Sequence, residues 1–251
     1  MSGEFSGLVA VVTGGAAGIG EAIAAELTDR GAAVAVFDLD VAGVCAPRRG
    51  YPCNVTDRDS LAAATAGVAA DLGGIDILVN NAGISAVGTV EENTDDEWAR
   101  VLDVNVIGVA RATAAALPYL RRSEHPAVVN LCSIAALNGL PQRVLYSATK
   151  GAVQAMTYAM ATDHVHEGIR INAVSPGTVH TGFVDRMLAT FPDPVAEKAA
   201  LDARQATGRM VTVDEVAGAV AYLASPRSGS STGTILDVDG GVTHLRVRPQ
   251  S

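Results

Sequence analysis

Short, almost uninterrupted apolar runs alternate with helix-patterned stretches along this chain of 251 residues. A strand covered on both faces reads as a continuous apolar run, because neither face meets water. A repeated strand–helix order favours parallel strands, right-handed crossovers and helices on both faces of one sheet. The pattern therefore predicts a single-domain, doubly wound α/β fold over residues 1–251. The expected strands are residues 8–13, 32–37, 75–80, 127–133, 169–175 and 234–239.

Capping signals set the expected helix boundaries. Thr94 and Thr212 are each followed three positions later by glutamate, the spacing of a capping box. Gly31 and Gly168 follow two other helical stretches, where glycine supplies the left-handed conformation that often ends a helix. The expected helices are residues 18–30, 95–121, 144–167 and 213–224.

The net charge of −9 excludes several classes of partner. An acidic chain repels nucleic-acid phosphates and anionic lipid, so we expect no nucleic-acid partner and no membrane association. Charge or glycine interrupts every apolar stretch before it reaches bilayer length. The three cysteines form no C-x-x-C motif, and residues 1–7 do not resemble a signal peptide, which predicts a cytoplasmic protein with free thiols. His164 and His166 face different sides of a helix, so we expect no metal site.

A glycine-rich turn, Thr13 to Gly20, follows the first strand and opens a helix. Glycines let the backbone approach a pyrophosphate, and the helix N-terminus offers free N–H groups to that anion. Asp38 ends the second strand, where a carboxylate accepts the ribose hydroxyls of adenosine and repels a 2′-phosphate. The glycine turn and residues 37–44 carry no Arg or Lys. These features favour NAD over NADP.

Tyr146 and Lys150 lie four residues apart on an expected helix and therefore share one face. A phenol becomes a better acid when a neighbouring ammonium stabilises its anion. Ser133 ends a strand, where its hydroxyl can hold a substrate oxygen. Asn105 lies inside a helix, an unfavourable place for asparagine unless its amide has a specific partner. Such Tyr–Lys pairs are common on helix surfaces, so only the whole group of residues indicates catalysis.

Together these motifs resemble those of the short-chain dehydrogenase/reductase family. The glycine turn, Asn80-Asn81-Ala82-Gly83, Ser133, the Tyr146/Lys150 pair and Pro176-Gly177 occur in the expected order between about residue 7 and residue 244. The resemblance implies a Rossmann-type, seven-stranded parallel sheet of order 3-2-1-4-5-6-7 and usually a homotetramer.

The resemblance also implies roles for a catalytic tetrad. Tyr146 would be the acid/base, Lys150 its activator and a ribose ligand, and Ser133 the group that polarises the substrate. Asn105 would hold a water that links Lys150 to solvent. The family usually has Asp-Val where this chain has Asn54-Val55, and an amide oxygen can still accept the adenine amino proton. The implied cofactor contacts are Gly14, Ala17, Gly18, Ile19, Gly20, Asp38, Leu39, Asn54, Val55, Asn81, Ala82, Gly83, Val104, Tyr146, Lys150, Pro176, Gly177, Val179 and Thr181.

The short connection between Asp38 and Asn54 resembles a subgroup that contains cytosolic type-2 3-hydroxybutyrate dehydrogenase and 2-keto-3-deoxy-L-fuconate dehydrogenase. In that subgroup, arginines matching Arg143, Arg186 and Arg204 line the substrate pocket. Guanidinium groups bind carboxylates bidentately. The resemblance therefore implies a hydroxy or keto carboxylate, a 3-hydroxy acid or a deoxy-sugar acid, beneath a lid at residues 182–209.

Other interpretations remain open at this point. The three arginines could be ordinary surface residues. The protein could be a sugar or polyol dehydrogenase, or an NADPH-dependent 3-oxoacyl reductase, although Asp38 argues against NADPH. It could also be a non-catalytic NAD-binding scaffold, although a complete tetrad argues against that. The physiological substrate and the direction of the reaction do not follow from the sequence.

Overall fold

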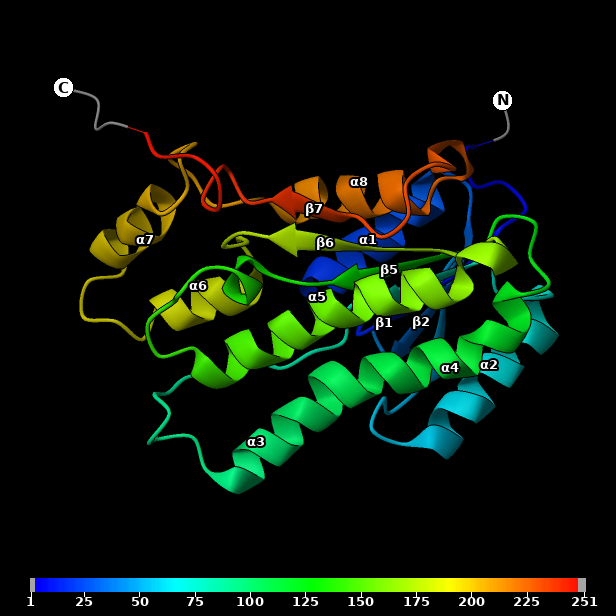
Figure 1. Ribbon diagram of the computed structural model, residues 1–251, viewed down its shortest axis with the longest axis horizontal. Helices are drawn as coiled ribbons and strands as arrows, with labels where there is room; N and C mark the ends of the chain where they lie inside the picture. The colour runs from blue at the N-terminus through cyan, green and yellow to red at the C-terminus, as the bar shows by residue number, and fades with distance from the viewer. Residues whose placement is uncertain (1–2, 248–251) are drawn as a thin grey trace.

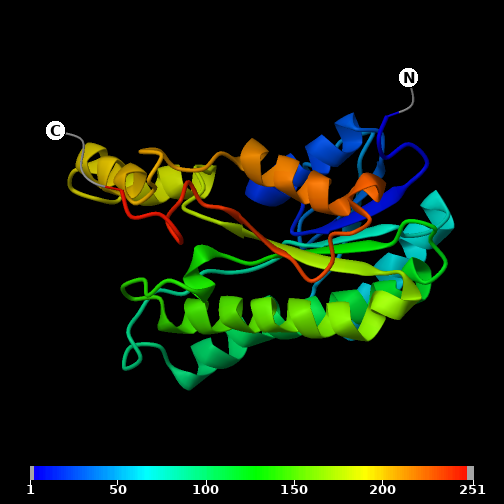
Figure 2. The same cartoon turned by 45° about the horizontal axis from the view of Figure 1, so that its top comes forward.

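The computed structural model describes residues 3–247 as one parallel sheet between two layers of helices (Figures 1 and 2). The strand order is β3-β2-β1-β4-β5-β6-β7, and every neighbouring pair is parallel. The predicted single-domain α/β fold and its strand order are therefore confirmed. The strands are β1 Val9–Thr13, β2 Ala33–Asp38, β3 Arg49–Pro52, β4 Ile77–Asn80, β5 Ala127–Leu131, β6 Arg170–Pro176 and β7 Ile235–Val238.

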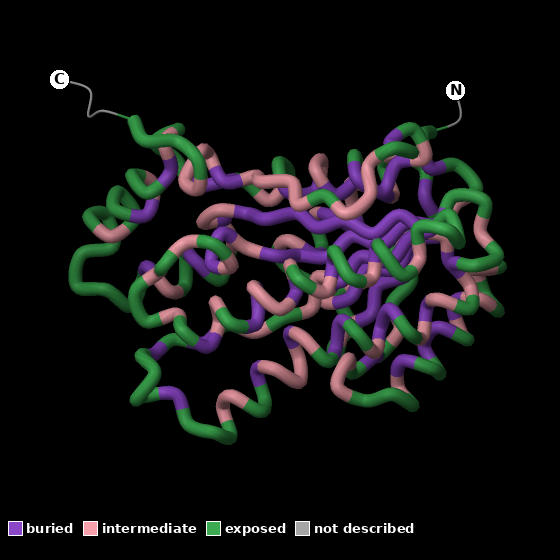
Figure 3. The backbone as a smooth tube through the Cα atoms, viewed as in Figure 1, coloured by how far each residue is buried: buried purple, intermediate pink, exposed green. Residues whose placement is uncertain are grey.

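Helices cover both faces of the sheet. On one face, α1 (Gly18–Asp29) and α8 (Val213–Ala224) pack together, and on the other lie α2 (Arg58–Leu72), α4 (Gly108–Leu120) and α5 (Val144–His164). The central strands are buried between these layers, as expected from their apolar sequences (Figure 3). The remaining elements are α3 Asp95–Leu102, α6 Gly182–Leu188, α7 Pro194–Ala203 and the short turns η1 Asp103–Ile107, η2 Ile134–Ala136, η3 Val165–Glu167 and η4 Pro226–Ser228.

Four elements, β3, α2, α6 and α7, had no counterpart among the expected strands and helices. The edge strand β3 has the sequence Arg-Gly-Tyr-Pro and is largely exposed, so it carries no apolar run. The helix α2 is rich in alanine, which blurs the contrast between its two faces. Its cap was a usable signal, because the Asp57 carboxylate accepts hydrogen bonds from the Asp59 and Ser60 N–H groups.

The long helix expected over residues 95–121 is interrupted by one π-helical turn, η1, which contains Asn105. Its predicted capping box is half formed. Thr94 accepts a hydrogen bond from the Glu97 N–H (3.2 Å), but the Glu97 carboxylate binds the Asn93 amide instead of returning to Thr94. The box formed by Thr212 and Glu215 before α8 is complete.

One helix in the described part of the chain, the continuous run Asp95–Leu120, is long and apolar enough to cross a bilayer by length and composition. In the fold, this run packs against α2 and α5 on one face of the sheet. Its buried side chains, such as Val101, Val109 and Leu120, belong to the core beneath that layer. Packing inside the protein therefore accounts for its apolar residues.

Candidate active site

A cavity of about 900 Å³ opens at the carboxyl ends of the strands. Parallel α/β sheets bind ligands at this edge, where the strand order reverses beside β1. Every predicted site residue lines the cavity except Gly20 and Asn105. The lining residues that sequence reasoning did not name are Phe37, Cys53, Ile84, Ser85, Leu131, Cys132, Ile134, Leu140, Thr178, Gly182, Phe183, Val184, Met187 and Leu201.

The glycine turn forms one end of this cavity. Gly14 has a φ of 62°, and its N–H donates to the Phe37 carbonyl oxygen (2.7 Å). A Cβ on Gly20 would lie 2.1 Å from the Gly14 carbonyl oxygen, which explains why Gly20 packs beneath the turn and does not line the cavity. A Cβ on Gly18 would meet nothing within 4 Å. No side chain caps the N-terminus of α1, so its first N–H groups and the open space at Gly18 fit a pyrophosphate.

Asp38 stands beside the glycine turn at the end of β2. Its carboxylate accepts hydrogen bonds from the Ala16 N–H (3.1 Å) and the Leu39 N–H (2.8 Å). These bonds fix the carboxylate at the cavity wall and leave each oxygen able to accept another donor. The Asn54 side-chain oxygen accepts from both the N–H and the hydroxyl of Thr56 (3.0 and 2.9 Å). Its expected contact with adenine stays a prediction.

The tyrosine and lysine both face the cavity from α5. Lys150 is 6% exposed, and its Nζ donates to the Leu131 carbonyl oxygen (2.7 Å) while lying 5.7 Å from the centre of the Tyr146 ring. Ser133 lies just beyond β5, and its hydroxyl accepts a hydrogen bond from the Ala135 N–H (3.1 Å). The end of β5 therefore places the serine and the lysine's carbonyl partner beside the tyrosine helix.

Asn105 connects two walls of the cavity. Its side chain accepts from the Ile84 N–H (2.8 Å) and donates to the Ile84 carbonyl oxygen (2.9 Å) and to the Thr149 hydroxyl (3.2 Å). The Thr149 hydroxyl in turn donates to the Tyr146 carbonyl oxygen (2.8 Å). These are the specific partners that an asparagine inside a helix requires. The water that Asn105 was expected to hold stays a prediction.

Two further side chains at the cavity have structural partners. The Asn81 amide donates to the Thr13 and Gly14 carbonyl oxygens (3.0 and 2.9 Å) and so joins β4 to the glycine turn. The thiol of Cys132 lies 3.4 Å from the Lys150 carbonyl oxygen. Burial raises the pKa of the Cys132 thiol, which keeps it protonated and a weak nucleophile.

Three arginines surround the opposite end of the cavity. Arg143 precedes α5, and its Nη1 donates to the Ser85 hydroxyl and to the Ala86 carbonyl oxygen (both 3.0 Å). Arg186 and Arg204 reach the same cavity from the segment that carries α6 and α7, and both are exposed. Among the described residues that line the cavity, Asp38 at the other end is the only acid. The arginine end of the cavity is therefore strongly positive.

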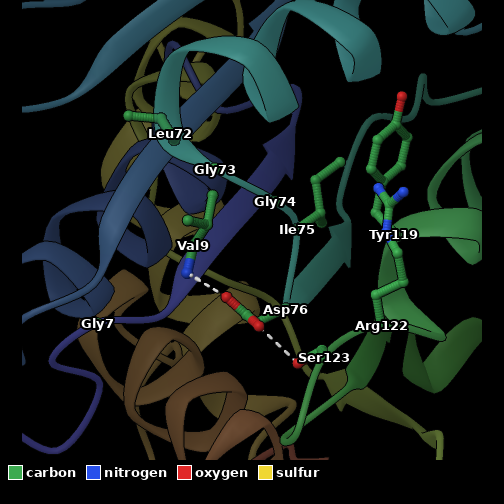
Figure 4. A pocket seen from close by; sticks show the side chains of 10 residues that line it. All are labelled: Gly7, Val9, Leu72, Gly73, Gly74, Ile75, Asp76, Tyr119, Arg122 and Ser123. Atoms are coloured by element: carbon green, nitrogen blue, oxygen red, sulfur yellow. Dashed lines mark hydrogen bonds between the residues drawn. The ribbon is translucent and has the colours of Figure 1, made fainter.

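A second, smaller pocket of about 260 Å³ lies at the amino ends of the strands (Figure 4). Asp76 stands in it and accepts hydrogen bonds from the Val9 N–H (2.7 Å) and the Ser123 hydroxyl (2.5 Å). The Arg122 guanidinium lies 4.9 Å from the centre of the Tyr119 ring. Both carboxylate oxygens of Asp76 therefore have hydrogen-bond partners within the protein.

Comparisons with known proteins place this geometry in a family. Residues 14–243 match the family model described as Enoyl-(Acyl carrier protein) reductase. The chain is 36% identical to 2-(S)-hydroxypropyl-CoM dehydrogenase 3 of Xanthobacter autotrophicus, over 98% of this chain and 100% of that protein. It is 39% identical to cis-4-hydroxycyclohexanecarboxylate dehydrogenase of Sinomonas cyclohexanicum, over 97% and 99%. The ligand-free aldohexose dehydrogenase of Thermoplasma acidophilum superposes with a TM-score of 0.93 at 32% identity, over the whole of both chains.

Proposed function

Because the chain belongs to the short-chain dehydrogenase/reductase family of nicotinamide-dependent oxidoreductases that act on alcohol groups, we propose that it uses NAD to interconvert the hydroxy and keto forms of a carboxylate. One observation carries this proposal. A single cavity has a carboxylate, Asp38, at the dinucleotide end and three arginines at the end beside Tyr146. The bound nicotinamide supplies a carbon that accepts or gives a hydride.

The residues around Tyr146 supply the proton chemistry. In oxidation, the phenolate of Tyr146 takes the proton of the substrate alcohol, and in reduction the phenol returns it. The Lys150 ammonium lies on the same face of α5, 5.7 Å from the centre of the Tyr146 ring. The hydroxyl of Ser133, held by the Ala135 N–H, donates to the substrate oxygen and fixes its position. Asn105 hydrogen-bonds to both Ile84 and Thr149 and so fixes the position of α5 relative to the loop at Ile84.

The proposed preference for NAD rests on the position of Asp38. A 2′-phosphate would lie beside a carboxylate that two backbone N–H groups already hold in place. Arg48, a basic residue beyond Asp38, directs its Nη1 towards the Glu21 carbonyl oxygen (3.5 Å) and does not line the cavity. Replacing Asp38→Ala should lower the ratio of kcat/KM with NAD to that with NADP by about tenfold or more, which corresponds to losing one charged interaction.

The control for this test is Asp40→Ala, an exposed aspartate two residues further on. It should leave the cofactor ratio near that of the wild type. An Asp38→Ala enzyme with an unchanged ratio would refute the assigned role of this carboxylate.

The positive end of the cavity supports an anionic substrate. Arg143 is held by Ser85 and Ala86 through one of its nitrogens, which leaves its other donors for a carboxylate. The name of the Sinomonas relative describes such a compound, a ring alcohol that carries a carboxylate. Arg186 and Arg204 lie on the segment 182–209, which we propose closes over this anion as a lid.

A screen of hydroxy acids and aldonic-acid derivatives, followed by NADH absorbance, tests the substrate class. The variant Arg143→Ala should raise KM for carboxylate substrates by about tenfold or more and leave KM for neutral alcohols almost unchanged. Arg122→Ala, at the opposite end of the sheet, is the matched control. If Arg143→Ala changes KM equally for acids and for neutral alcohols, the proposal that the substrate is a carboxylate is refuted.

A neutral sugar is the second candidate substrate. The superposition on an aldohexose dehydrogenase over the whole chain favours it. Sugars offer hydroxyl groups and no charge, so the same screen separates the two candidates. If the protein turns over aldohexoses and Arg143→Ala does not change that activity, the substrate is a neutral sugar.

We also propose that the protein is a cytoplasmic homotetramer. The outer faces of the α4 and α5 layer expose the apolar side chains Ile107, Val144, Tyr158 and Val165. Exposed apolar side chains on packed helices suit contacts with further copies of the chain. Analytical ultracentrifugation at micromolar concentration measures the assembly, and a monomer there would refute it.

A further inference from the structure

Residues 239–245 follow β7 directly and form a tight turn. We call it the C-terminal brace. In Figures 1 and 2, this red segment runs beside the helices of the segment 182–209. The carboxylate of Asp239 organises the turn by accepting from the Gly241 N–H (2.7 Å) and the Thr243 N–H (2.9 Å).

Asp239 is buried, with 6% of its surface exposed, and it remains a charged acceptor inside the brace. Burial by itself raises the pKa of Asp239, but the hydrogen bonds from Thr243 and Gly241 outweigh it, so the pKa is lower than usual. A buried carboxylate that accepts several N–H bonds fixes the backbone around it. The brace is therefore rigid where it contacts its neighbours.

The brace contacts the C-terminal base of the segment 182–209. The Thr207 N–H donates to the Gly240 carbonyl oxygen (3.1 Å). Gly240 has a φ of 61°, and a Cβ there would lie 2.5 Å from the Thr207 hydroxyl. The backbone of the brace thus lies too close to Thr207 for any side chain at position 240.

The same turn reaches two other walls of the cavity. A Cβ on Gly177 would lie 3.0 Å from the Asp239 Cα, so the brace packs directly on the backbone that follows β6. On the other side, the Thr243 hydroxyl accepts a hydrogen bond from the Asn138 amide (3.0 Å). Asn138 also donates to the Ile134 carbonyl oxygen (3.0 Å), in the turn that begins at Ser133.

We propose that Asp239 is a positioning residue that fixes the lid base, the Gly177 loop and the Ser133 turn relative to one another. It touches none of the reacting atoms, and it acts by keeping the brace folded against these three segments. The expected effect of Asp239 on KM and kcat rests on the proposed function. Its expected effect on the mobility of the segment 182–209 does not. The two consequences can be measured separately.

Hydrogen exchange tests the mobility of the lid without any need for turnover. In Asp239→Asn, an amide N–H₂ replaces one acceptor, so a backbone N–H loses its partner. Peptides covering residues 201–209 should then exchange about tenfold faster than in the wild type, the change expected from losing one charged hydrogen bond. The matched control is Asp76→Asn, which removes one acceptor from a carboxylate with two donors at the amino ends of the strands. It should leave exchange at 201–209 unchanged.

Kinetics test the second consequence with the best NAD-linked substrate from the screen. Asp239→Asn should raise KM by about tenfold, since binding must order a loosened lid, and should lower kcat several-fold, since the Ser133 turn loses its support. Affinity for NADH, measured by fluorescence, should change by less than about twofold. Asp76→Asn should change none of these values.

A second pair of variants covers the case in which Asp239→Asn does not fold. Thr243→Val removes the hydroxyl that holds Asn138 and keeps the N–H that binds Asp239, whereas Thr243→Ser keeps both. Thr243→Val should lower kcat several-fold, and Thr243→Ser should restore it. The proposal is overturned if Asp239→Asn changes neither the hydrogen exchange of residues 201–209 nor KM. It is also overturned if Thr243→Val and Thr243→Ser have the same kcat. If no substrate turns over in the wild type, the proposed function fails, and the exchange experiment alone decides the role of the brace.

Discussion

The two ends of the sheet treat their polar groups differently. At the amino ends, Asp76 uses both carboxylate oxygens on Val9 and Ser123, and Arg122 lies against Tyr119 (Figure 4). At the carboxyl ends, Tyr146, Arg186 and Arg204 face a cavity more than three times as large. A polar side chain whose partners lie within the protein therefore indicates a structural role. Several polar side chains that face one open cavity indicate a role in binding or catalysis.

The largest effect should come from Tyr146→Phe, which removes one oxygen at the carboxyl end. We expect kcat to fall by about a thousandfold, the size of a general acid–base contribution, with NADH affinity and the free energy of unfolding nearly unchanged. Stopped-flow turnover and NADH fluorescence measure these quantities. Tyr222→Phe, on an exposed part of α8, is the control. Near-normal turnover in Tyr146→Phe would overturn the acid/base assignment.

At the amino end, Asp76→Asn should show the opposite profile. One of the two donors, the Val9 N–H or the Ser123 hydroxyl, loses its partner. The free energy of unfolding should therefore fall by about 1–3 kcal/mol, while kcat and KM per folded molecule stay the same. Urea unfolding beside steady-state kinetics makes this measurement.

The exposed Asp71→Asn serves as a surface reference, with an expected loss below about 1 kcal/mol. A change in KM for Asp76→Asn would contradict the distinction between the two ends.

Local sequence patterns predicted part of the site at the carboxyl end, and the family resemblance implied the remaining cofactor contacts and the three arginines. The glycine turn and the Tyr146/Lys150 pair are recognisable because their spacing along one helix or one turn already determines which face they share. Strand order and the convergence of separated motifs followed from the α/β pattern and the family resemblance. The elements β3 and α2 were missed because an exposed edge strand and an alanine-rich helix lack a strong apolar pattern, and α6 and α7 were expected only as part of a lid segment.

The contacts that hold the site together were not predictable in the same way. The Asn138–Thr243 bond joins residues 105 positions apart, and the bond between Arg143 and Ser85 spans 58. Neither member of such a pair carries a local signal, because each is an ordinary loop residue until the fold brings its partner close. The π-helical turn at Asn105 is similar, since its reason lies in Ile84 and Thr149. Sequence thus identifies reacting groups more readily than it identifies the residues that position them.

The smallest effect should come from a carboxylate at the carboxyl end that has a structural role. Glu215 binds Arg209 through both oxygens (2.7 and 2.9 Å) and accepts from the Thr212 N–H (2.8 Å), which ties the end of the lid segment to α8. The Arg209 hydrogen bond, followed by that of Thr212, lowers the pKa of Glu215 from 4.5 to about 2. Because the folded pKa is the lower one, this stabilisation is present above pH 4.5 and is lost as the pH falls towards about 2.

Glu215→Gln should therefore reduce the free energy of unfolding at neutral pH by less than about 1 kcal/mol, since the pair is exposed and screened by solvent. The difference from the wild type should shrink as the pH is lowered from about 5 to 3, where the carboxylate becomes protonated in the unfolded chain. Urea unfolding across this range measures it, with the exposed Glu124→Gln as the control. A difference that stayed constant with pH would show that the capping bond, and not the charge, stabilises this contact. Unchanged kcat would place Glu215 with Asp76 as a structural carboxylate, despite its position near the cavity.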